Sequence, residues 1–580
     1  MLFLKKCFTL FNLILISVSS SYALAPSTAA PAAIYSQTAI HHPVWAKHGM
    51  VSTQEALATK IGVDILKQGG NAVDAAVAVG YALAVTLPRA GNLGGGGFML
   101  LYLAEQKRAV AIDYREKAPA KAFRDMYLDK DGKVNKQLSR HHGLAVGTPG
   151  TVMGLESARK KYGTLSRKEL MAPAIRLAKE GFVVSSDLEN SLTAMKQRLS
   201  VWPDTKKIFY KTDGSTYKTG ERLIQSDLAA SLQRISDKGT DGFYHGYTAE
   251  KIEKSVTEAG GIISQADLKS YQAVERQPVT GTYRGYQVLS MPPPSSGGVH
   301  IVQMLNMLEN YPLAEMGHNS ADSIHIMAEA MRRAYADRSL YLGDSDFVNV
   351  PVKALTNKSY AQDLSKTINL SRASLSSDIA PGKIQPYESN ETTHFSIIDK
   401  WGNSVSNTYT LNFSYGSGMV AQGTGILLNN EMDDFSAKPG SANGYGLIGG
   451  EANAVEGNKR PLSSMTPTIL LKDNQPYLIT GTPGGSRIIS TTLQIILNVV
   501  DYQMNIAEAS AAVRIHHQWL PDYIRIEKGL STDTIELLEK KDHKVKVQAA
   551  MGSTQTIMKS ENGVYGASDP RKPGALSLGY

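Results

Sequence analysis

Two adjacent threonines offer a possible nucleophile in the segment 387–398, which reads YESNETTHFSII. A threonine hydroxyl needs an adjacent base, and we find no G-x-S-x-G or H-E-x-x-H motif that would supply a conventional site. Cleavage between Glu391 and Thr392 would give Thr392 a free α-amine with a pKa of roughly 7.7–8.0, which can act as general base. The same hydroxyl can first attack the preceding carbonyl, so one residue would serve both cleavage and turnover. Threonine also favours strands, and a purely structural role is the alternative.

The predicted partner strand brings further polar groups to Thr392. Residues 400–402 read as a three-residue hairpin loop with glycine at the left-handed position. Counting back across this loop places Thr410 opposite Thr392, and Asn412 follows on the same face because side chains alternate along a strand. Three polar side chains at the open end of one hairpin indicate a place where something binds.

Two loops supply further candidate groups. Residues 461–465 read PLSSM and place two hydroxyls side by side ahead of a predicted strand. The turn 481–486 reads GTPGGS and leads into an apolar helix, so its backbone N–H groups lie where negative charge is favoured. This turn is a candidate oxyanion hole, and each segment also fits an ordinary turn.

Charged residues cluster in two other segments. Residues 429–435 read NNEMDDF and place three carboxylates within four residues, which fits an ammonium site or a solvated loop but not an EF-hand. Arg115 can clamp a carboxylate bidentately, although the residues alone favour a structural pair with Glu116 or Asp113. The four glycines at 94–97 lack the G-K-[ST] of a phosphate-binding loop, which indicates a packing or turn role.

Helical and strand-like patterns alternate along the chain and predict packed α and β layers. Hydrophobic periodicity predicts the elements that must position the polar groups. The predicted helices cover 52–68, 72–86 and 486–502, with 150–340 mainly helical, and the predicted strands cover 98–103, 109–114, 393–399, 403–412, 466–471 and 476–481.

The N-terminal segment Met1–Ala25 predicts export. Lys5 and Lys6 precede an apolar stretch and a small-residue site, so we expect a signal peptide cleaved after Ala25. Cys7 is the only cysteine, which excludes disulfides and cysteine-ligated metals from the mature chain. We expect a periplasmic protein without a membrane anchor, because no later apolar run is long enough to cross a bilayer. A net charge of +8 over 580 residues, without interleaved aromatic residues, argues against a nucleic-acid partner.

Taken together, these segments resemble the γ-glutamyltransferases, or γ-glutamyltranspeptidases, in particular the bacterial periplasmic ones. The resemblance covers about residues 40–580 and rests on several long motifs in one order. These motifs are GNLGGGGFML at 91–100, DYREKAPA at 113–120, MPPPSSGG at 291–298, NETTHFS at 390–396, NNEMDDFS at 429–436, NKRPLSSMTPT at 458–468 and GTPGGSRI at 481–488.

The resemblance implies an α+β fold of the N-terminal-nucleophile hydrolase type, a four-layer αββα sandwich built from two self-cleaved subunits. The large subunit would comprise residues 26–391 and the small subunit residues 392–580, and the two would stay associated. The implied catalytic residues are Thr392 as nucleophile, Thr410 as its support, and Gly484 and Gly485 as the oxyanion hole. The implied substrate-binding residues are Arg115, Ser463 and Ser464 for an α-carboxylate, Asn412, Glu431 and Asp434 for an α-amino group, and Tyr445 in a lid loop.

The implied activity moves the γ-glutamyl group of glutathione or a related compound onto Thr392 and then to water, an amino acid or a dipeptide. No cofactor or metal is implied. One alternative is a glutaryl β-lactam acylase of the same fold. A glutaryl group has no α-amine, so Asn412, Glu431 and Asp434 favour γ-glutamyl substrates. The other alternative is an uncleaved binding protein for γ-glutamyl peptides.

Overall fold

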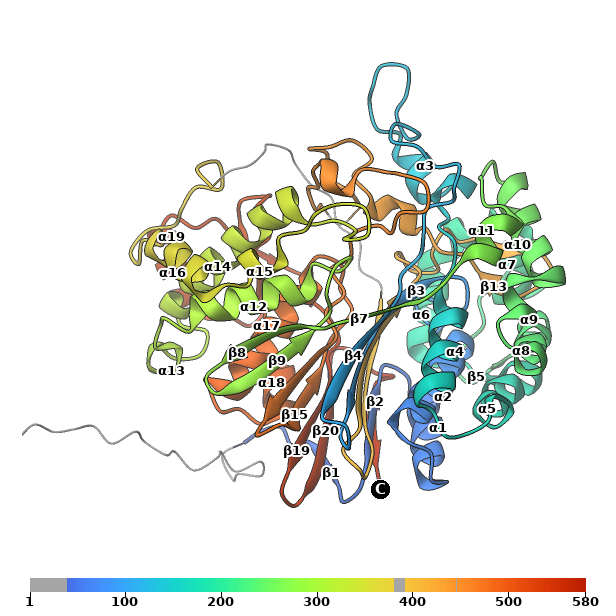
Figure 1. Cartoon of the computed structure of the whole chain (residues 1–580), viewed down its shortest axis with the longest axis horizontal. Helices are drawn as coiled ribbons and strands as arrows, with labels where there is room; N and C mark the ends of the chain where they lie inside the picture. The colour runs from blue at the N-terminus through green and yellow to red at the C-terminus, as the bar shows by residue number, and fades with distance from the viewer. Residues whose placement is uncertain (1–38, 380–391, 445) are drawn as a thin grey trace, which may run out of the picture.

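Two seven-stranded β-sheets, packed face to face, form the centre of the protein (Figure 1). The computed structural model describes residues 39–379, 392–444 and 446–580. In order across the first sheet, the strands are β21 (Leu576–Gly579), β2 (Met50–Thr53), β10 (Thr393–Ile398), β11 (Ser404–Thr410), β3 (Gly96–Leu103), β4 (Arg108–Tyr114) and β7 (Val274–Arg276). Across the second sheet they are β1 (Val44–Ala46), β20 (Gly563–Ser568), β19 (Gln555–Ser560), β15 (Gln475–Thr480), β14 (Thr468–Lys472), β9 (Tyr286–Ser290) and β8 (Val279–Tyr283).

Helices cover the outer face of each sheet, which confirms the predicted αββα layers (Figure 1). The helices on the first sheet are α1 (Ala56–Lys67), α2 (Ala72–Thr86) and α4 (Thr151–Tyr162), with α5 (Arg167–Glu180) and α8 (Ser226–Lys238) behind them. Those on the second sheet are α12 (Gly297–Leu308) and α18 (Ile506–Ala511), with α14 (Ala321–Tyr341) and α17 (Arg487–Val500) packed on α12. Both predicted N-terminal helices and the predicted apolar helix near the C-terminus are therefore present.

The remaining elements are shorter or lie outside the four layers. The helices among them are α3 (Lys136–Arg140), α6 (Ser186–Leu199), α7 (Pro203–Phe209), α9 (Asp241–Tyr244), α10 (Gly246–Glu258), α11 (Gln265–Ser270), α13 (Leu313–Met316), α15 (Val352–Leu355), α16 (Lys358–Lys366) and α19 (Thr532–Lys540), and the 3-10 helices η1 (Gly143–Ala145), η2 (Glu431–Asp434) and η3 (Glu451–Asn453). The strands are β5 (Phe182–Val183), β6 (Arg222–Leu223), β12 (Val420–Ala421), β13 (Ile426–Leu427), β16 (Ile515–His516), β17 (Ile524–Glu527) and β18 (Val545–Gln548). No helix in the described ranges combines the length and apolarity needed to cross a membrane.

Strand β3 shows why the central strands are apolar on both faces. Its alternate residues Phe98 and Leu100 belong to the core between the two sheets. The intervening Met99 and Leu101 belong to the core between the first sheet and its helices. Successive side chains of a strand point to opposite faces, so a sheet covered on both sides buries every residue.

The hairpin of β10 and β11 has the register predicted from its loop. Thr393 lies opposite Tyr409 in an antiparallel ladder. At the loop, the Asp399 carboxylate accepts the first backbone N–H of α2 at 2.9 Å, which ties the hairpin to the buried helix. The open end of the hairpin therefore carries Thr392 on one strand and Thr410 on the other.

Helix α2 begins at a buried carboxylate. Every residue of the helix is buried, and Asp74 lies in its first turn. The Asp74 carboxylate accepts hydrogen bonds from the backbone N–H of Asn71 at 2.9 Å, the backbone N–H of Thr164 at 2.9 Å and the Thr164 hydroxyl at 2.7 Å. This single side chain satisfies the start of α2 and attaches it to the segment after α4.

Replacing Asp74 with alanine should lower the free energy of unfolding by about 3 kcal/mol, because buried N–H groups lose their acceptor. Thermal unfolding followed by circular dichroism measures the effect. The matched control is Asp64→Ala in α1: Asp64 is exposed, and its removal should change the free energy of unfolding by less than about 0.5 kcal/mol. Equal melting temperatures for the two variants would contradict this role of Asp74.

Candidate active site

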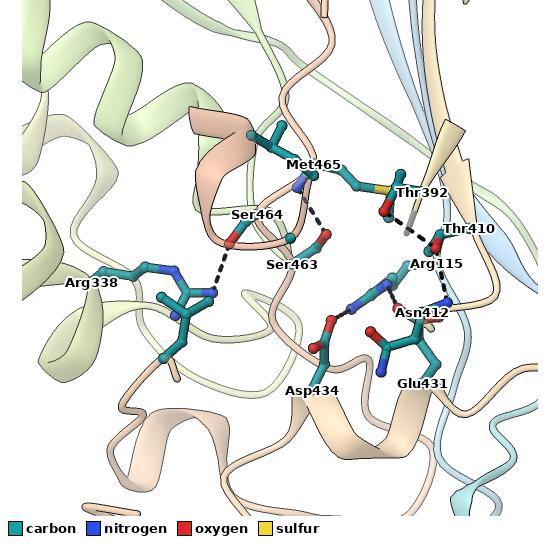
Figure 2. Close-up of a pocket in the computed structure, with 13 residues that line it drawn as sticks. Arg115, Arg338, Thr392, Thr410, Asn412, Glu431, Asp434, Ser463, Ser464 and Met465 are labelled. Carbon is teal, nitrogen blue, oxygen red and sulfur yellow. Dashed lines mark hydrogen bonds and ion pairs between the residues drawn. The ribbon is translucent and has the colours of Figure 1, made fainter. Parts of the chain in front are cut away.

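Thr392 lies directly before β10, and its side chain points to the end of β11 (Figure 2). Its Oγ1 donates a long hydrogen bond to Oγ1 of Thr410 at 3.4 Å, beyond the usual range of about 2.5–3.0 Å between two hydroxyls. Both threonines are buried. Thr410 Oγ1 also accepts the backbone N–H of Asn412 at 2.8 Å. The hairpin thus brings together the predicted nucleophile and its predicted support.

The glycine-rich segment 91–97 holds Thr410 from behind. The Asn92 side-chain amide donates to the carbonyl oxygen of Thr410 at 2.9 Å, and Asn92 Oδ1 accepts the backbone N–H of Gly95 at 2.9 Å. A Cβ atom on Gly95 would lie 2.0 Å from the Thr410 carbonyl oxygen, so only glycine permits this close approach. The predicted packing role of these glycines is confirmed at this position.

Asn412 connects the hairpin to the acidic segment. Its φ of 76° lies in the left-handed region, which asparagine tolerates better than most residues. Its side-chain amide donates to the carbonyl oxygen of Asn430 at 3.0 Å. Asn430 directly precedes η2, so the end of β11 and the carboxylates of η2 are held next to each other.

Arg115, from the segment after β4, meets two carboxylates of η2 (Figure 2). The Arg115 Nη1 contacts Glu431 Oε1, and Nη2 lies 2.5 Å from Asp434 Oδ2. A 3-10 helix has three residues per turn, so positions 431 and 434 share one face. All three side chains are buried or nearly so, and the contacts join segments more than 300 residues apart in the sequence.

The local sequence predicted that Arg115 pairs with Glu116 or Asp113; the ion pair with Glu116 is present, but the carboxylates of η2 lie closer. Glu116 Oε2 lies 3.8 Å from Arg115 Nη1, further than either carboxylate of η2. Asp113 accepts the backbone N–H of Arg115 at 3.0 Å rather than its guanidinium. Adjacent residues on an extended segment point to opposite faces, which keeps Glu116 from a close contact with Arg115, and the tertiary fold supplied closer partners.

Glu116 is a third carboxylate beside Arg115. It is 1% exposed, and neither of its carboxylate oxygens has a hydrogen-bond partner among the described residues. Burial raises the pKa of Glu116 to about 7. Burial also raises the pKa of Glu431 and of Asp434 above their usual values, against the opposing effect of Arg115. The group of three carboxylates around Arg115 therefore retains at least one proton at mildly acidic pH.

Asp433, the remaining carboxylate of the acidic segment, is turned towards other partners. It accepts hydrogen bonds from the hydroxyl of Ser139 at 2.7 Å, from Arg140 Nε at 3.1 Å and from the backbone N–H of Gly444 at 2.7 Å. Its role is to anchor η2 to α3 and to the following loop. Only two of the three clustered carboxylates reach the pocket.

The serine pair stands on a loop braced by the segment 291–298. The carbonyl oxygen of Ser463 accepts the backbone N–H of Ser296 at 2.8 Å. The backbone N–H of Ser463 donates to the carbonyl oxygen of Pro294 at 2.8 Å. The Ser463 hydroxyl oxygen accepts the backbone N–H of Met465 at 3.1 Å. The motif MPPPSSGG at 291–298 therefore positions the predicted carboxylate-binding hydroxyls.

Gly484 and Gly485 form the turn between β15 and α17. Their φ angles of 137° and 56° lie in the region that favours glycine. Gly485 lines the same pocket as Thr392, next to the start of α17. The oxyanion-hole role of the two glycines stays a prediction.

One pocket contains nine of the predicted site residues. They are Arg115, Thr392, Thr410, Asn412, Glu431, Asp434, Ser463, Ser464 and Gly485. Its volume of about 20 Å³ admits little more than one water molecule, because the charged side chains contact one another. Gly484 is not among the lining residues, and the predicted site residues Glu391 and Tyr445 lie outside the described part of the chain.

Four lining residues were missed by the sequence analysis: Arg338, Leu447, Met465 and Ile488. Leu447 and Ile488 lie next to predicted segments, and Met465 ends the PLSSM motif, so proximity was the available signal for these three. Arg338 comes from α14, far from every motif with a candidate role, and no local pattern distinguishes it from the other arginines of that helix.

A second cluster of potential ligands lies outside this pocket. Atoms of His325, Glu329 and His543 lie within 4.8 Å of one another. The two imidazoles hydrogen-bond directly at 2.7 Å, and Glu329 is paired with Arg332 and Arg333. The partners present already satisfy these groups, and two guanidiniums beside the carboxylate oppose a further cation.

Comparisons with known proteins agree with this geometry. The chain is 56% identical over 568 residues to the glutathione hydrolase proenzyme of Escherichia coli strain K12, covering 98% of both chains. It is 37% identical over 511 residues to the acylase ACY 1 proenzyme of Pseudomonas sp. strain SE83, covering 87% of this chain and 88% of the acylase.

Solved structures give the same result. A cephalosporin acylase from Bacillus halodurans superposes with a TM-score of 0.82 at 26% identity, covering 94% of this chain and 98% of that one. A chain of Helicobacter pylori γ-glutamyltranspeptidase, at 49% identity, covers 56% of this chain and 93% of its own length, with a TM-score of 0.55. The family model of the gamma-glutamyltranspeptidases matches residues 58–579, and the chain belongs to this family.

Proposed function

We propose that this chain is a self-processing γ-glutamyl transferase and hydrolase that acts on glutathione and related γ-glutamyl compounds. The observation that carries this proposal is the position of Thr392 at the start of β10, within reach of Thr410 and on the wall of a pocket that holds both charge signs. The names of its relatives support the substrate class, because the Escherichia coli and Pseudomonas sp. strain A14 relatives are glutathione hydrolase proenzymes.

Maturation begins at the bond between Glu391 and Thr392. The Thr392 hydroxyl attacks the Glu391 carbonyl carbon, the C–N bond breaks, and the resulting ester is hydrolysed by water. The products are the carboxylate of Glu391 and a free α-amine on Thr392. The hydrogen bond between the two threonine hydroxyls orients the Thr392 oxygen for this attack.

Turnover uses the amine that cleavage creates. The α-amine of Thr392 takes the hydroxyl proton, and the oxygen attacks the γ-carbonyl of the donor. Backbone N–H groups of Gly484 and Gly485 stabilise the negative charge on the carbonyl oxygen. The donor's amine leaves with the proton, and water or an amino acid or dipeptide amine then takes the γ-glutamyl group from the ester.

Recognition depends on the two charges of the donor's amino acid end. Arg115, Ser463 and Ser464 hold the α-carboxylate, while Glu431, Asp434 and Asn412 hold the α-ammonium. In the pocket as it stands, Arg115 pairs directly with the two carboxylates of η2. A ligand with one charge of each sign can replace these contacts without leaving a charge unpaired. Three carboxylates surround the single guanidinium of Arg115, so the acidic groups outnumber the cation. This imbalance favours a ligand that brings an ammonium.

The loop around residue 445 completes the site as a lid. By its match to the family motif, Tyr445, which lies outside the described residues, is the candidate for closing over the pocket towards Asn412. The neighbouring Asn443 donates from its side chain to Asp434 Oδ1 at 3.2 Å, which attaches this loop to a residue that binds substrate. Closure would exclude water from the ester before an acceptor arrives.

The two products of cleavage stay together as a heterodimer of residues 26–391 and 392–580, exported to the periplasm after removal of residues 1–25. The sheet order supports this association. Strand β10 pairs with β2, β11 with β3 and β14 with β9, so both portions contribute neighbouring strands to each sheet. Cutting one peptide bond before β10 leaves these ladders intact.

A denaturing gel of the purified mature protein should show two bands at roughly 40 and 20 kDa, from residues 26–391 and 392–580. Thr392→Ala should leave one band and abolish turnover, because it removes the attacking oxygen. The matched control is Thr393→Ala, which removes the hydroxyl of the neighbouring threonine. This variant should still give two bands. Cleavage or turnover by the Thr392→Ala protein would refute the mechanism.

The wild-type enzyme should hydrolyse a γ-glutamyl anilide at least about tenfold faster than the matching glutaryl anilide, because the latter leaves Glu431 and Asp434 without an ammonium partner. Initial rates at equal, subsaturating concentrations give this ratio. Asp434→Asn should reduce the preference towards unity. A wild-type preference for the glutaryl compound would favour the acylase alternative instead.

Stability should depend on pH through Glu116. The unfolded carboxyl titrates near 4.5 and the folded one near 7, so the stability gained from the buried, protonated acid is lost as pH rises from about 5 to 8. Glu116→Gln mimics the protonated acid, and its melting temperature should fall less over this range than that of the wild type. Glu105→Gln, at an exposed position, should keep the wild-type dependence. Parallel curves for all three proteins would show that Glu116 does not titrate in this range.

A further inference from the structure

Arg338 is a second guanidinium in the pocket, and it differs from Arg115 in its partners (Figure 2). It projects from α14 and is only 3% exposed. Its Nε donates to the hydroxyl of Ser296 at 2.9 Å, and its Nη2 donates to the hydroxyl of Ser464 at 3.3 Å. Within the described ranges, no carboxylate lies in ion-pair distance of Arg338, whereas Arg115 contacts two.

A buried cation without a contacting anion is costly, so it is a feature that needs a ligand or a second role. Burial lowers the pKa of Arg338 to about 10, which still leaves it charged at neutral pH. The nearest positive charge, on Arg115, is already shared by Glu431 and Asp434. Arg338 is therefore the cation of this pocket whose charge is least compensated by direct contacts.

The hydrogen-bond directions at Ser464 point to an anion. A guanidinium has only donors, so the Ser464 oxygen is the acceptor, and its hydroxyl hydrogen must point away from Arg338. A hydroxyl that accepts from a cation is polarised and becomes a better donor. The Ser463 hydroxyl oxygen likewise accepts a backbone N–H, from Met465, which leaves its own hydrogen to donate. Two adjacent donors backed by a cation fit a carboxylate.

Ser296 extends the same arrangement to Ser463. Its hydroxyl accepts from Arg338 Nε at 2.9 Å and donates to the carbonyl oxygen of Ser463 at 2.8 Å. One guanidinium therefore contacts Ser464 directly and Ser463 through one hydroxyl. Removing the Arg338 side chain would therefore remove its hydrogen bond to Ser464 and its indirect support of Ser463 through Ser296.

We propose that Arg338 is a positioning residue for the carboxylate end of the substrate: it holds the Ser464 hydroxyl as a donor towards the α-carboxylate, braces the Ser463 backbone through Ser296, and supplies positive charge behind both serines. This inference rests on the proposed function and deepens it, because it divides carboxylate recognition between two arginines. Arg115 then balances the ammonium-binding acids as well as contacting the carboxylate, and Arg338 acts through the serines.

The test compares two ligands by titration calorimetry, which does not depend on turnover. L-glutamate carries the α-carboxylate, and 4-aminobutanoate is the same molecule without it. In Arg338→Gln, the dissociation constant of L-glutamate should rise at least about tenfold, the loss expected for hydrogen bonds to a charged group, while that of 4-aminobutanoate should change less than about twofold. Arg338→Lys keeps the charge and should recover part of the glutamate affinity.

A double-mutant cycle shows whether Arg338 acts through the serine. Ser464→Ala alone should weaken glutamate binding, and adding Arg338→Gln should cost much less than it does in the wild type, because the two residues share one interaction. Additive losses would overturn the proposal. Equal weakening of both ligands in Arg338→Gln would also overturn it, since a merely structural role predicts that result.

Arg333→Gln is the matched control for loss of a buried arginine from the same helix. Arg333 pairs with Glu329 outside the pocket. This variant should lower the melting temperature and leave the ratio of the two dissociation constants unchanged. Wild-type turnover of a γ-glutamyl anilide tests the proposed function separately: an active wild type with unaltered binding in Arg338→Gln would refute this inference alone.

Discussion

The antiparallel pairing of β10 with β11 is the constraint on which the site depends. These strands lie in the middle of the first sheet, where β2 and β3 fix the register from either side. A slip of one residue would turn every side chain of the hairpin to the opposite face. Anchors at both ends, the Asp399 carboxylate at the loop and the Asn92 amide at the open end, hold Thr392 and Thr410 in the same place.

The same pairing explains how a chain can be cut inside its own active site. The proposed cleavage before β10 would separate two portions that contribute neighbouring strands to both sheets. The hydrogen bonds of those ladders and the apolar core between the sheets do not pass through the cut bond. A new N-terminus at Thr392 would therefore stay beside Thr410, as the proposed mechanism requires, and both sheets would remain intact.

Charge balance then decides what the pocket can accept. Two carboxylates of η2 contact Arg115, and a third carboxylate lies beside it. Arg338 instead donates its hydrogen bonds to serine hydroxyls. In the proposed binding mode, an amino acid end would place its ammonium near the acids and its carboxylate near the serines that Arg338 contacts. A glutaryl group lacks the first of these charges and would leave Glu431 and Asp434 without an ammonium partner.

Local sequence was sufficient for the elements and for the reactive hairpin. A three-residue loop sets the register of its two strands, so Thr410 could be placed opposite Thr392 without other information. Motif matches then indicated the serines, the acids of η2 and the glycine turn. Short-range geometry carries these predictions because loop length and side-chain alternation act within a few residues.

Only the tertiary structure decided the partners of the charged side chains. Arg115 was expected to pair with a neighbour in sequence, and Glu116 does lie in ion-pair distance, yet its closer contacts are with residues 316 and 319 positions away. Arg338 carried no local signal, because what distinguishes it is the approach of α14 to the serine loop. Ion pairs inside a core depend on which segments the packed layers bring together. The order of residues along the chain does not determine how far apart two charged side chains lie in the fold.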